Sequence, residues 1–134
     1  MKMRIKGTQP TYADIGAAGM DIRASEEVVL YPHQITKVKT GLHVEIPRWH
    51  YGALVGRSGM AAKGILAHYG TIDESYRGEI TVILFNTTDD RYKVAVGDRV
   101  AQLIIQPYVR VDFEVVEKLS ETSRGTGGLG SSGK

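Results

Sequence analysis

The segment Gly70–Glu79 holds the residues best suited to catalysis, because it combines acidic side chains with a tyrosine. An aspartate is ordinarily ionised at neutral pH, so the carboxylate of Asp73 could take a proton from an attacking water. The flat ring of Tyr76 could stack on a sugar or a base. A plain polar turn between two strands would account for the same residues, since loops are usually polar.

A second segment, Gly56–Ala61, has the composition of a phosphate-binding turn. It precedes a short helix, and the free N–H groups of a helix start attract anions. The forked guanidinium of Arg57 suits phosphate oxygens, and the hydroxyl of Ser58 can donate a hydrogen bond. A helix cap beside a solvated arginine is the structural alternative, because serine is a favoured capping residue.

Polar residues within apolar runs mark two further segments, Ala18–Ala24 and Gly97–Ile105. Asp21 stands between apolar neighbours, after Gly19, which permits an unusual backbone angle. Gln102 is an amide within a predicted buried strand, and a buried amide must find hydrogen-bond partners. A capped turn at Asp21 and a structural hydrogen bond from Gln102 are the alternatives to a role in binding.

The last part of the chain, residues 120–134, is rich in glycine and serine, with Leu129 as its only large apolar residue. Such a segment cannot bury enough surface to offset its ordering entropy, so we expect it to be mobile without a ligand. Its backbone N–H groups, together with Arg124, could wrap phosphates. A flexible linker has a similar composition.

The elements that must position these residues are mostly β-strands, because short runs rich in Val, Ile, Thr, Tyr and Phe alternate with turn residues. One helix is predicted at Ser58–Lys63, with Ser58 as its cap and Gly64 as its stop. The length of 134 residues indicates one domain, residues 1–119, followed by a flexible arm, residues 120–134. The predicted strands are Lys2–Lys6, Val28–Leu30, Ile35–Lys39, Leu42–Ile46, Tyr51–Val55, Gly78–Asn86, Arg99–Pro107 and Arg110–Glu117.

Composition excludes several classes of protein. The charges, 17 basic and 15 acidic for a net +2, are dispersed along the chain, whereas a nucleic-acid binder more often has a basic cluster. The absence of cysteine excludes disulfides and thiolate metal sites. No apolar run resembles a signal peptide or a membrane span, so we expect a cytoplasmic protein, or one inside the host cell if its source is a virus or phage.

Taken together and in order, these segments resemble the five motifs of the trimeric dUTPase family, over nearly the whole chain. The motifs are, in order, Ala18–Ala24, Gly56–Ala61, Gly70–Glu79, Gly97–Ile105 and Arg124–Gly133. The resemblance implies an all-β fold, a single-domain jelly roll or β-barrel with one short helix, assembled as a homotrimer. Each active site would take motifs one, two and four from one subunit, motif three from a second and the tail from the third.

The activity implied by the resemblance is the hydrolysis of dUTP to dUMP and pyrophosphate, with Mg²⁺ carried by the triphosphate. Such an enzyme keeps uracil out of DNA and supplies dUMP for thymidylate synthesis. Asp73 matches the carboxylate that deprotonates the water attacking the α-phosphorus. Asp21 matches the residue that holds the water shell of the metal, so no direct protein ligand is expected. Gln102 matches an amide near the phosphates.

The same resemblance implies the substrate contacts. Tyr76 matches the ring beneath the deoxyribose, and Arg124 matches the tail arginine that reaches the γ-phosphate. A hairpin containing Leu66 to Gly70 would read uracil through its backbone. The implied substrate-binding residues are Arg57, Ser58, Gly59, Leu66, Ala67, Gly70, Ile72, Tyr76, Arg124, Gly128, Leu129, Gly130 and Ser131.

The sequence departs from the family pattern in its base-binding parts. Leu129 stands where an aromatic residue usually covers the uracil, and Ser132 stands where threonine is frequent. Ala67 replaces the asparagine of many bacterial members, which leaves base reading to backbone groups.

Two other functions remain open from the sequence. One is a nucleotide enzyme like dCTP deaminase, which shares the fold. The other is a trimeric binding or regulatory module.

Overall fold

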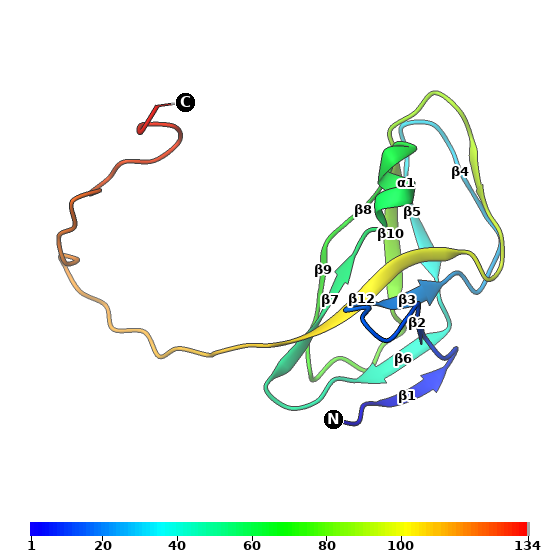
Figure 1. The fold of residues 1–134 in the computed structure, drawn as a ribbon, viewed down its shortest axis with the longest axis horizontal. Coiled ribbons are helices and arrows are strands. Elements are labelled where there is room, and N and C mark those ends of the chain that lie inside the picture. Colours follow the sequence, from blue (N-terminus) through cyan, green and yellow to red (C-terminus); the bar gives the residue numbers. More distant parts are fainter. Residues whose placement is uncertain (134) are drawn as a thin grey trace.

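Antiparallel β-strands supply almost all of the regular structure in the computed structural model, which describes residues 1–133 (Figure 1). The single helix, α1, spans Ser58–Ala62. The strands are β1 (Arg4–Gly7), β2 (Thr11–Tyr12), β3 (Met20–Arg23), β4 (Val28–Leu30), β5 (Ile35–Lys39), β6 (Leu42–Glu45), β7 (His50–Val55), β8 (Ile65–Ala67), β9 (Gly70–Ile72), β10 (Thr81–Asn86), β11 (Tyr92–Val94) and β12 (Arg99–Pro107).

The largest sheet has five strands in the order β2-β3-β12-β7-β9, and β12 runs through its middle. A second sheet has the order β5-β10-β8, and two strand pairs, β1-β6 and β11-β4, complete the fold. This arrangement confirms the predicted all-β class with one short helix. Because β12 pairs with β3 on one side and β7 on the other, it brings together segments that are distant in sequence.

The hydrophobic core lies between the sheets and follows the alternation of side chains along each strand. Around β10, Ile80, Val82 and Leu84 are buried, whereas Phe85 is 38% exposed. Successive side chains of a strand point to opposite faces, so the alternating sequence predicts this result. Buried side chains from most other strands complete the core, among them Ile22, Leu30, Val38, Leu42, Ile65, Val94, Val100 and Leu103.

Most predicted strands are confirmed, three of them with the predicted bounds: Val28–Leu30, Ile35–Lys39 and Arg99–Pro107. The prediction of a strand at Arg110–Glu117 is wrong, because these residues form no strand in the chain. Their alternating pattern is that of a strand, but a strand also needs a neighbour for its backbone hydrogen bonds. The sequence analysis did not predict five short strands: β2, β3, β8, β9 and β11.

Beyond Pro107 the chain leaves the body and runs away from it as a long tail, drawn in yellow to red in Figure 1. Apolar side chains at its start are highly exposed: Val109 at 88%, Phe113 at 90% and Val115 at 96%. The last strand therefore ends twelve residues before the predicted boundary at residue 119, since Pro107 is its final residue. The boundary itself stays a prediction.

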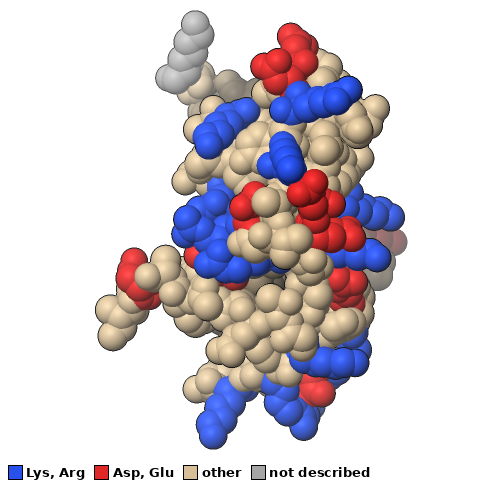
Figure 2. All heavy atoms as spheres, turned by 90° about the vertical axis from the view of Figure 1, so that its right-hand side faces the viewer, with Lys and Arg blue, Asp and Glu red and all other residues tan. Residues whose placement is uncertain are grey.

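Basic and acidic side chains are interspersed over the face drawn in Figure 2. This pattern agrees with the dispersed charges of the sequence. Within residues 1–133, the structure contains no helix with the length and apolarity needed to cross a membrane.

Candidate functional site

Strand register gathers motifs one, two and four at one place in the large sheet. Gln102 of β12 lies opposite Asp21 of β3 and, on its other side, opposite Val55 of β7. Arg57 and Ser58 follow Val55 directly after Gly56. The predicted site residues Asp21, Gln102, Arg57 and Ser58 therefore meet, and with Arg99 we call them the phosphate-side cluster.

Gly19 makes room for Gln102 in this cluster. A Cβ atom at Gly19 would lie 3.0 Å from Cβ and 3.3 Å from Oε1 of Gln102. The sequence analysis expected Gly19 to supply an unusual backbone angle, but Gly19 does not have a positive φ angle. Its role is the close approach of two strands, which a side chain would obstruct.

Arg99 joins Asp21 to Arg57, and sequence reasoning missed this role. Asp21 is 3% exposed, and its Oδ2 lies 3.5 Å from a guanidinium nitrogen of Arg99. Arg57 donates a hydrogen bond of 3.1 Å to the carbonyl oxygen of Arg99. The ladder between β12 and β3 shifts by one residue between Arg99 and Ala101. Such bulges re-aim side chains, and periodicity in the sequence does not reveal them.

The helix prediction is confirmed, but its cap is not the predicted one. Arg57 occupies the cap position and makes no side-chain capping bond, and Ser58 is the first helical residue. Gly64 ends the helix as expected, with a φ angle of +82°. A Cβ atom added at Gly59 would meet nothing within 4 Å, so the backbone there is open to a ligand.

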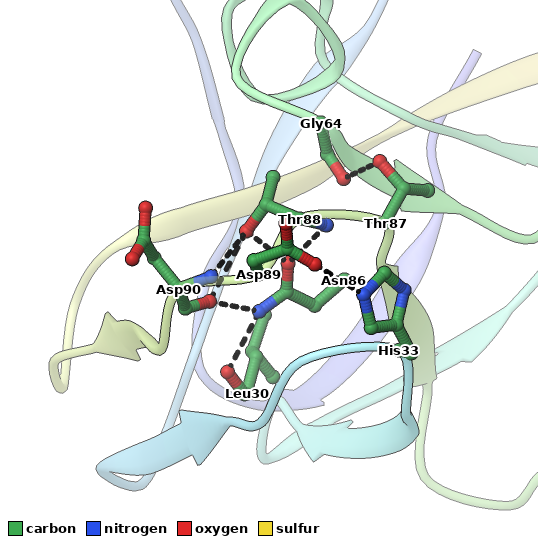
Figure 3. A network of polar contacts seen from close by, with 8 residues as sticks. All are labelled: Leu30, His33, Gly64, Asn86, Thr87, Thr88, Asp89 and Asp90. Carbon is green, nitrogen blue, oxygen red and sulfur yellow. Dashed lines mark hydrogen bonds and ion pairs between the residues drawn. The ribbon is translucent and has the colours of Figure 1, made fainter.

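A polar turn built around the buried side chain of Asn86 anchors the far end of α1, as Figure 3 shows. Thr87 donates to the carbonyl oxygen of Gly64 from both its N–H, at 2.9 Å, and its hydroxyl, at 2.8 Å. Asn86 is fully buried, and its amide donates to the carbonyls of Leu30 and Asp90 while its oxygen accepts two bonds from Thr88. A fully satisfied buried network is rigid, so the turn fixes the helix that follows Arg57.

The turn of motif three, residues 73–76, carries Asp73 and Tyr76. The N–H of Tyr76 donates to the carbonyl oxygen of Asp73 at 3.0 Å, which closes the turn. The hydroxyl of Tyr76 donates to the carbonyl oxygen of Glu79 at 3.0 Å, which fixes the ring. Both residues line a cavity of about 210 Å³. Its other lining residues are Thr71, Ile72, Glu79 and Thr81.

A larger cavity of about 750 Å³ lies on another side of the same turn. Asp73 and Glu74 line it together with Tyr51, Tyr69, Thr71, Ser75, Tyr108 and Arg110. The hydrogen bond from Tyr108 and then that from the N–H of Trp49 lower the pKa of Glu74, against a smaller opposing effect of burial. The bond with Glu74 raises the pKa of Tyr108. Sequence reasoning missed Glu74 and Tyr108, because their contact joins residues 34 positions apart.

The two strands that flank the expected hairpin, Leu66 to Gly70, do not pair with each other. Leu66 and Ala67 belong to β8, which pairs with β10, whereas Gly70 and Ile72 belong to β9, which pairs with β7. The two strands follow each other in sequence but diverge into different sheets. β9 is the last strand in the order of the five-stranded sheet and therefore lies at its edge.

Asp73 does not meet the phosphate-side cluster within one chain. β9 pairs with β7 at Gly52 and Ile72, so Asp73 lies beside the His50 end of β7, whereas Arg57 follows the Val55 end. At about 3.3 Å per residue, the six positions from Tyr51 to Arg57 correspond to roughly 20 Å. Among residues 1–133, no three His, Asp or Glu side chains gather in a metal-binding group.

The predicted tail residues lie apart from both groups (Figure 1). Within the tail, Arg124 donates to the carbonyl oxygen of Gly127 at 2.8 Å, and Leu129 is fully exposed. Arg124 and the residues from Gly127 to Ser132 enclose a space of about 450 Å³ among themselves. The chain by itself therefore brings together four of the predicted site residues at the sheet and a second set at the motif-three turn.

Comparisons with known proteins place this architecture in a family. The family model described as dUTPase matches residues 6–133. The chain is 43% identical to the deoxyuridine 5'-triphosphate nucleotidohydrolase of Picosynechococcus sp., covering 99% of this chain and 96% of that protein. It is 44% identical to the enzyme of the same name from Paramecium bursaria Chlorella virus 1, covering 98% and 94%.

Solved structures agree with the sequence relatives. A variant of the dUTPase of Staphylococcus bacteriophage 80alpha, in complex with dUpNHpp, superposes with a TM-score of 0.93 at 28% identity, covering 99% of both chains. A variant of the dUTPase of phage phi11 of S. aureus, described with a structural Mg(II) ion, has a TM-score of 0.82 at 25% identity, covering 88% and 98%. The strands, the motif order and these matches lead to one conclusion: the chain belongs to the dUTPase family.

Proposed function

We propose that the chain hydrolyses dUTP to dUMP and pyrophosphate through attack of water on the α-phosphorus. The observation that carries the proposal is the phosphate-side cluster, in which Gln102 and Asp21 of two paired strands meet Arg57, which follows the neighbouring strand β7. A triphosphate repels an attacking nucleophile through its negative charge. Fixed positive charges and hydrogen-bond donors around it therefore contribute most to catalysis.

Within this cluster, Arg57 and Ser58 bind phosphate oxygens, and Gln102 donates its amide to them. The open space at Gly59 allows the chain backbone to approach the phosphates. Asp21 is the residue suited to Mg²⁺, because Mg²⁺ prefers oxygen ligands and retains waters while one or two carboxylates and substrate phosphates hold it. When bound, Mg²⁺ supplies charge neutralisation at the triphosphate.

The nucleoside binds at the motif-three turn. Tyr76, held by its bond to Glu79, packs beneath the deoxyribose and leaves no room for a 2′-hydroxyl. Asp73 serves as the general base for the attacking water, a role that typically contributes 10²–10⁴-fold. Its exposed carboxylate on the rim of the 210 Å³ cavity supports this assignment.

Uracil is read by backbone groups between β8 and β9. This role for Leu66, Ala67, Gly70 and Ile72 is supported by the divergence of the two strands and by the edge position of β9, which leaves one side of that strand without a strand partner in the described chain. A backbone N–H aimed at a uracil carbonyl would reject the amino group of cytosine. Mismatched hydrogen-bond groups in a closed site discriminate by about 10⁴-fold or more.

The chain acts as a homotrimer with shared active sites. Two observations support this assembly. Asp73 and Arg57 lie at opposite ends of β7, too far apart to act on one substrate molecule from the same subunit. The segment from Val109 to Val115 has an alternating apolar pattern and high exposure, which suits pairing with another copy of the chain.

The arm, residues 120–134, closes over the bound nucleotide. Arg124 reaches the γ-phosphate, and Gly128, Gly130 and Ser131 offer small residues for backbone contact with phosphates. Leu129 covers the uracil without stacking on it. Closure of such a lid excludes water and completes the site.

The test is pyrophosphate release from dUTP, dCTP, dTTP and UTP, each with and without Mg²⁺. We expect hydrolysis of dUTP alone, enhanced by Mg²⁺. Ammonia release from dCTP would instead identify a deaminase. The absence of turnover with every nucleotide would leave only a binding module of this fold.

A further inference from the structure

The side chain of Glu74 ties the motif-three turn to two other parts of the chain. Its Oε2 accepts a hydrogen bond of 2.7 Å from the backbone N–H of Trp49, in the loop before β7. The same oxygen accepts a bond of 2.8 Å from the hydroxyl of Tyr108, directly after β12. We call this arrangement of Glu74, Trp49 and Tyr108 the clasp.

The other two members of the clasp are themselves held together. The backbone N–H of Tyr108 donates to the carbonyl oxygen of Trp49 at 3.0 Å, and the two rings pack with centroids 6.1 Å apart. Trp49 has a φ angle of +64°, which is uncommon for a bulky residue and persists only where surrounding contacts impose it. Glu74 therefore binds a well-defined partner surface.

The charge of Glu74 strengthens the clasp. Its two donors, with smaller contributions from Arg48 and Arg110, hold the pKa of Glu74 below its usual value, so its carboxylate is charged at neutral pH. Hydrogen bonds to a charged acceptor are roughly twice as strong as neutral ones.

The rest of the turn moves with Glu74. Arg77 donates a hydrogen bond of 2.7 Å to the backbone carbonyl of Glu74, and the N–H of Tyr76 donates to that of Asp73. Loss of the contacts of Glu74 with Trp49 and Tyr108 would therefore release the backbone of the turn that carries Asp73 and Tyr76. Both of these residues line the smaller cavity.

We propose that Glu74 is a positioning residue, which sets the placement of Asp73 and Tyr76 through its contacts with Trp49 and Tyr108. The inference rests on the roles proposed above for Asp73 and Tyr76. Tyr108 is also the first residue after the last strand, so the clasp fixes the point from which the tail departs toward Arg124.

The experiment compares Glu74→Ala, Glu74→Gln and Tyr108→Phe with the wild type in the full-length protein. The matched control is Tyr51→Phe, which removes a phenol hydroxyl from the same cavity, where it contacts Gln106 and Tyr69 but not Glu74. The readouts are kcat and KM for dUTP, the ratio of kcat/KM for dUTP over UTP, and the midpoint of thermal unfolding.

We expect Glu74→Ala to lower kcat by roughly 10- to 100-fold, because misplacing a reacting group by about 1 Å costs up to 10²-fold. Its dUTP/UTP ratio falls as well, since the ring of Tyr76 shifts. Glu74→Gln retains most of the activity because the amide oxygen can accept both bonds. Tyr108→Phe lies between these variants, and Tyr51→Phe matches the wild type.

Several outcomes would overturn the inference. Wild-type kcat and selectivity in folded Glu74→Ala would do so, as would equal losses in Tyr108→Phe and Tyr51→Phe. If Glu74→Ala does not fold, Tyr108→Phe and Glu74→Gln still decide the matter. A fully active Asp73→Asn would instead refute the role of Asp73, whereas an inactive Asp73→Asn beside a normal Glu74→Ala would refute only the inference about Glu74.

Discussion

The phosphate-side cluster and the motif-three turn are organised by different means. Asp21 and Gln102 belong to paired strands, so the backbone ladder fixes their positions. Asp73 and Tyr76 lie in a turn outside any strand. The turn is held by the hydrogen bonds that the carboxylate of Glu74 accepts and by the one that the hydroxyl of Tyr76 donates. The cluster is thus placed by register and the turn by a few individual contacts, which makes the turn more sensitive to single substitutions.

The largest effect expected from the turn is that of Asp73→Asn. This variant keeps the size of the side chain but removes the base, so turnover should fall by about 10²–10⁴-fold. Binding of dUpNHpp, measured by calorimetry, should be retained. Near-normal turnover in this variant would show that Asp73 is not the general base. The motif-three turn would then not be more sensitive to this substitution than the phosphate-side cluster.

Deletion of the residues after Ser123 tests whether the phosphate-side cluster and the motif-three turn are sufficient for hydrolysis without the tail. Loss of Arg124 and of the lid should reduce hydrolysis by at least about 10²-fold, the usual cost of removing one charge-stabilising donor. The assembly state, measured by light scattering, should not change, because no strand includes residues 124–133. A truncated protein with full activity would show the arm to be only a linker.

Arg99→Ala tests the cluster through its stability. It leaves the buried carboxylate of Asp21 without its ion pair, which should cost about 1–3 kcal/mol in the free energy of unfolding, less than a fully buried pair because Arg99 is partly exposed. Arg4→Ala is the control, because its ion pair with Glu45 is exposed and should contribute little. Urea unfolding measures the free energy of unfolding of both variants. Equal losses in the two variants would contradict the stabilising role of the ion pair between Arg99 and Asp21.

Acid should weaken the turn slightly through Glu74. Because the folded-state pKa of Glu74 is lowered, its contribution to stability is present above the pKa of the unfolded chain and is lost as the pH falls through the folded value. Between about pH 5 and pH 3, thermal stability should therefore fall more in the wild type than in Glu74→Gln. Parallel pH profiles for the two proteins would show that the clasp does not depend on charge.

The sequence predicted those features that depend on local pattern. The alternation around β10 and the stop at Gly64 appear as expected, because each follows from neighbouring residues. β3 was missed because its four residues include Asp21 and follow a glycine, which suggests a turn. The pairing of Asp21 with Arg99 depends on a bulge, and the contact of Glu74 with Tyr108 depends on two distant segments meeting.

The failed prediction at Arg110–Glu117 has a different cause. The alternating side chains there are correct for a strand, but no strand among residues 1–133 pairs with it. Local sequence specifies the tendency to form a strand, whereas pairing depends on a second backbone. The proposed division of the active site between subunits would have the same origin, since a single chain does not encode the position of its neighbours in its local pattern.

The exposed apolar side chains of Val109, Val111, Phe113 and Val115 also bear on how the stability of the protein depends on its concentration. The single chain leaves this surface in water, and the proposed assembly would bury it. Stability that comes from association rises with total protein concentration, so dilution should lower the unfolding temperature. In a cell that produces this chain slowly, it would remain unassembled for longer, with its apolar side chains exposed to nonspecific contacts. Rapid accumulation would favour the assembled enzyme.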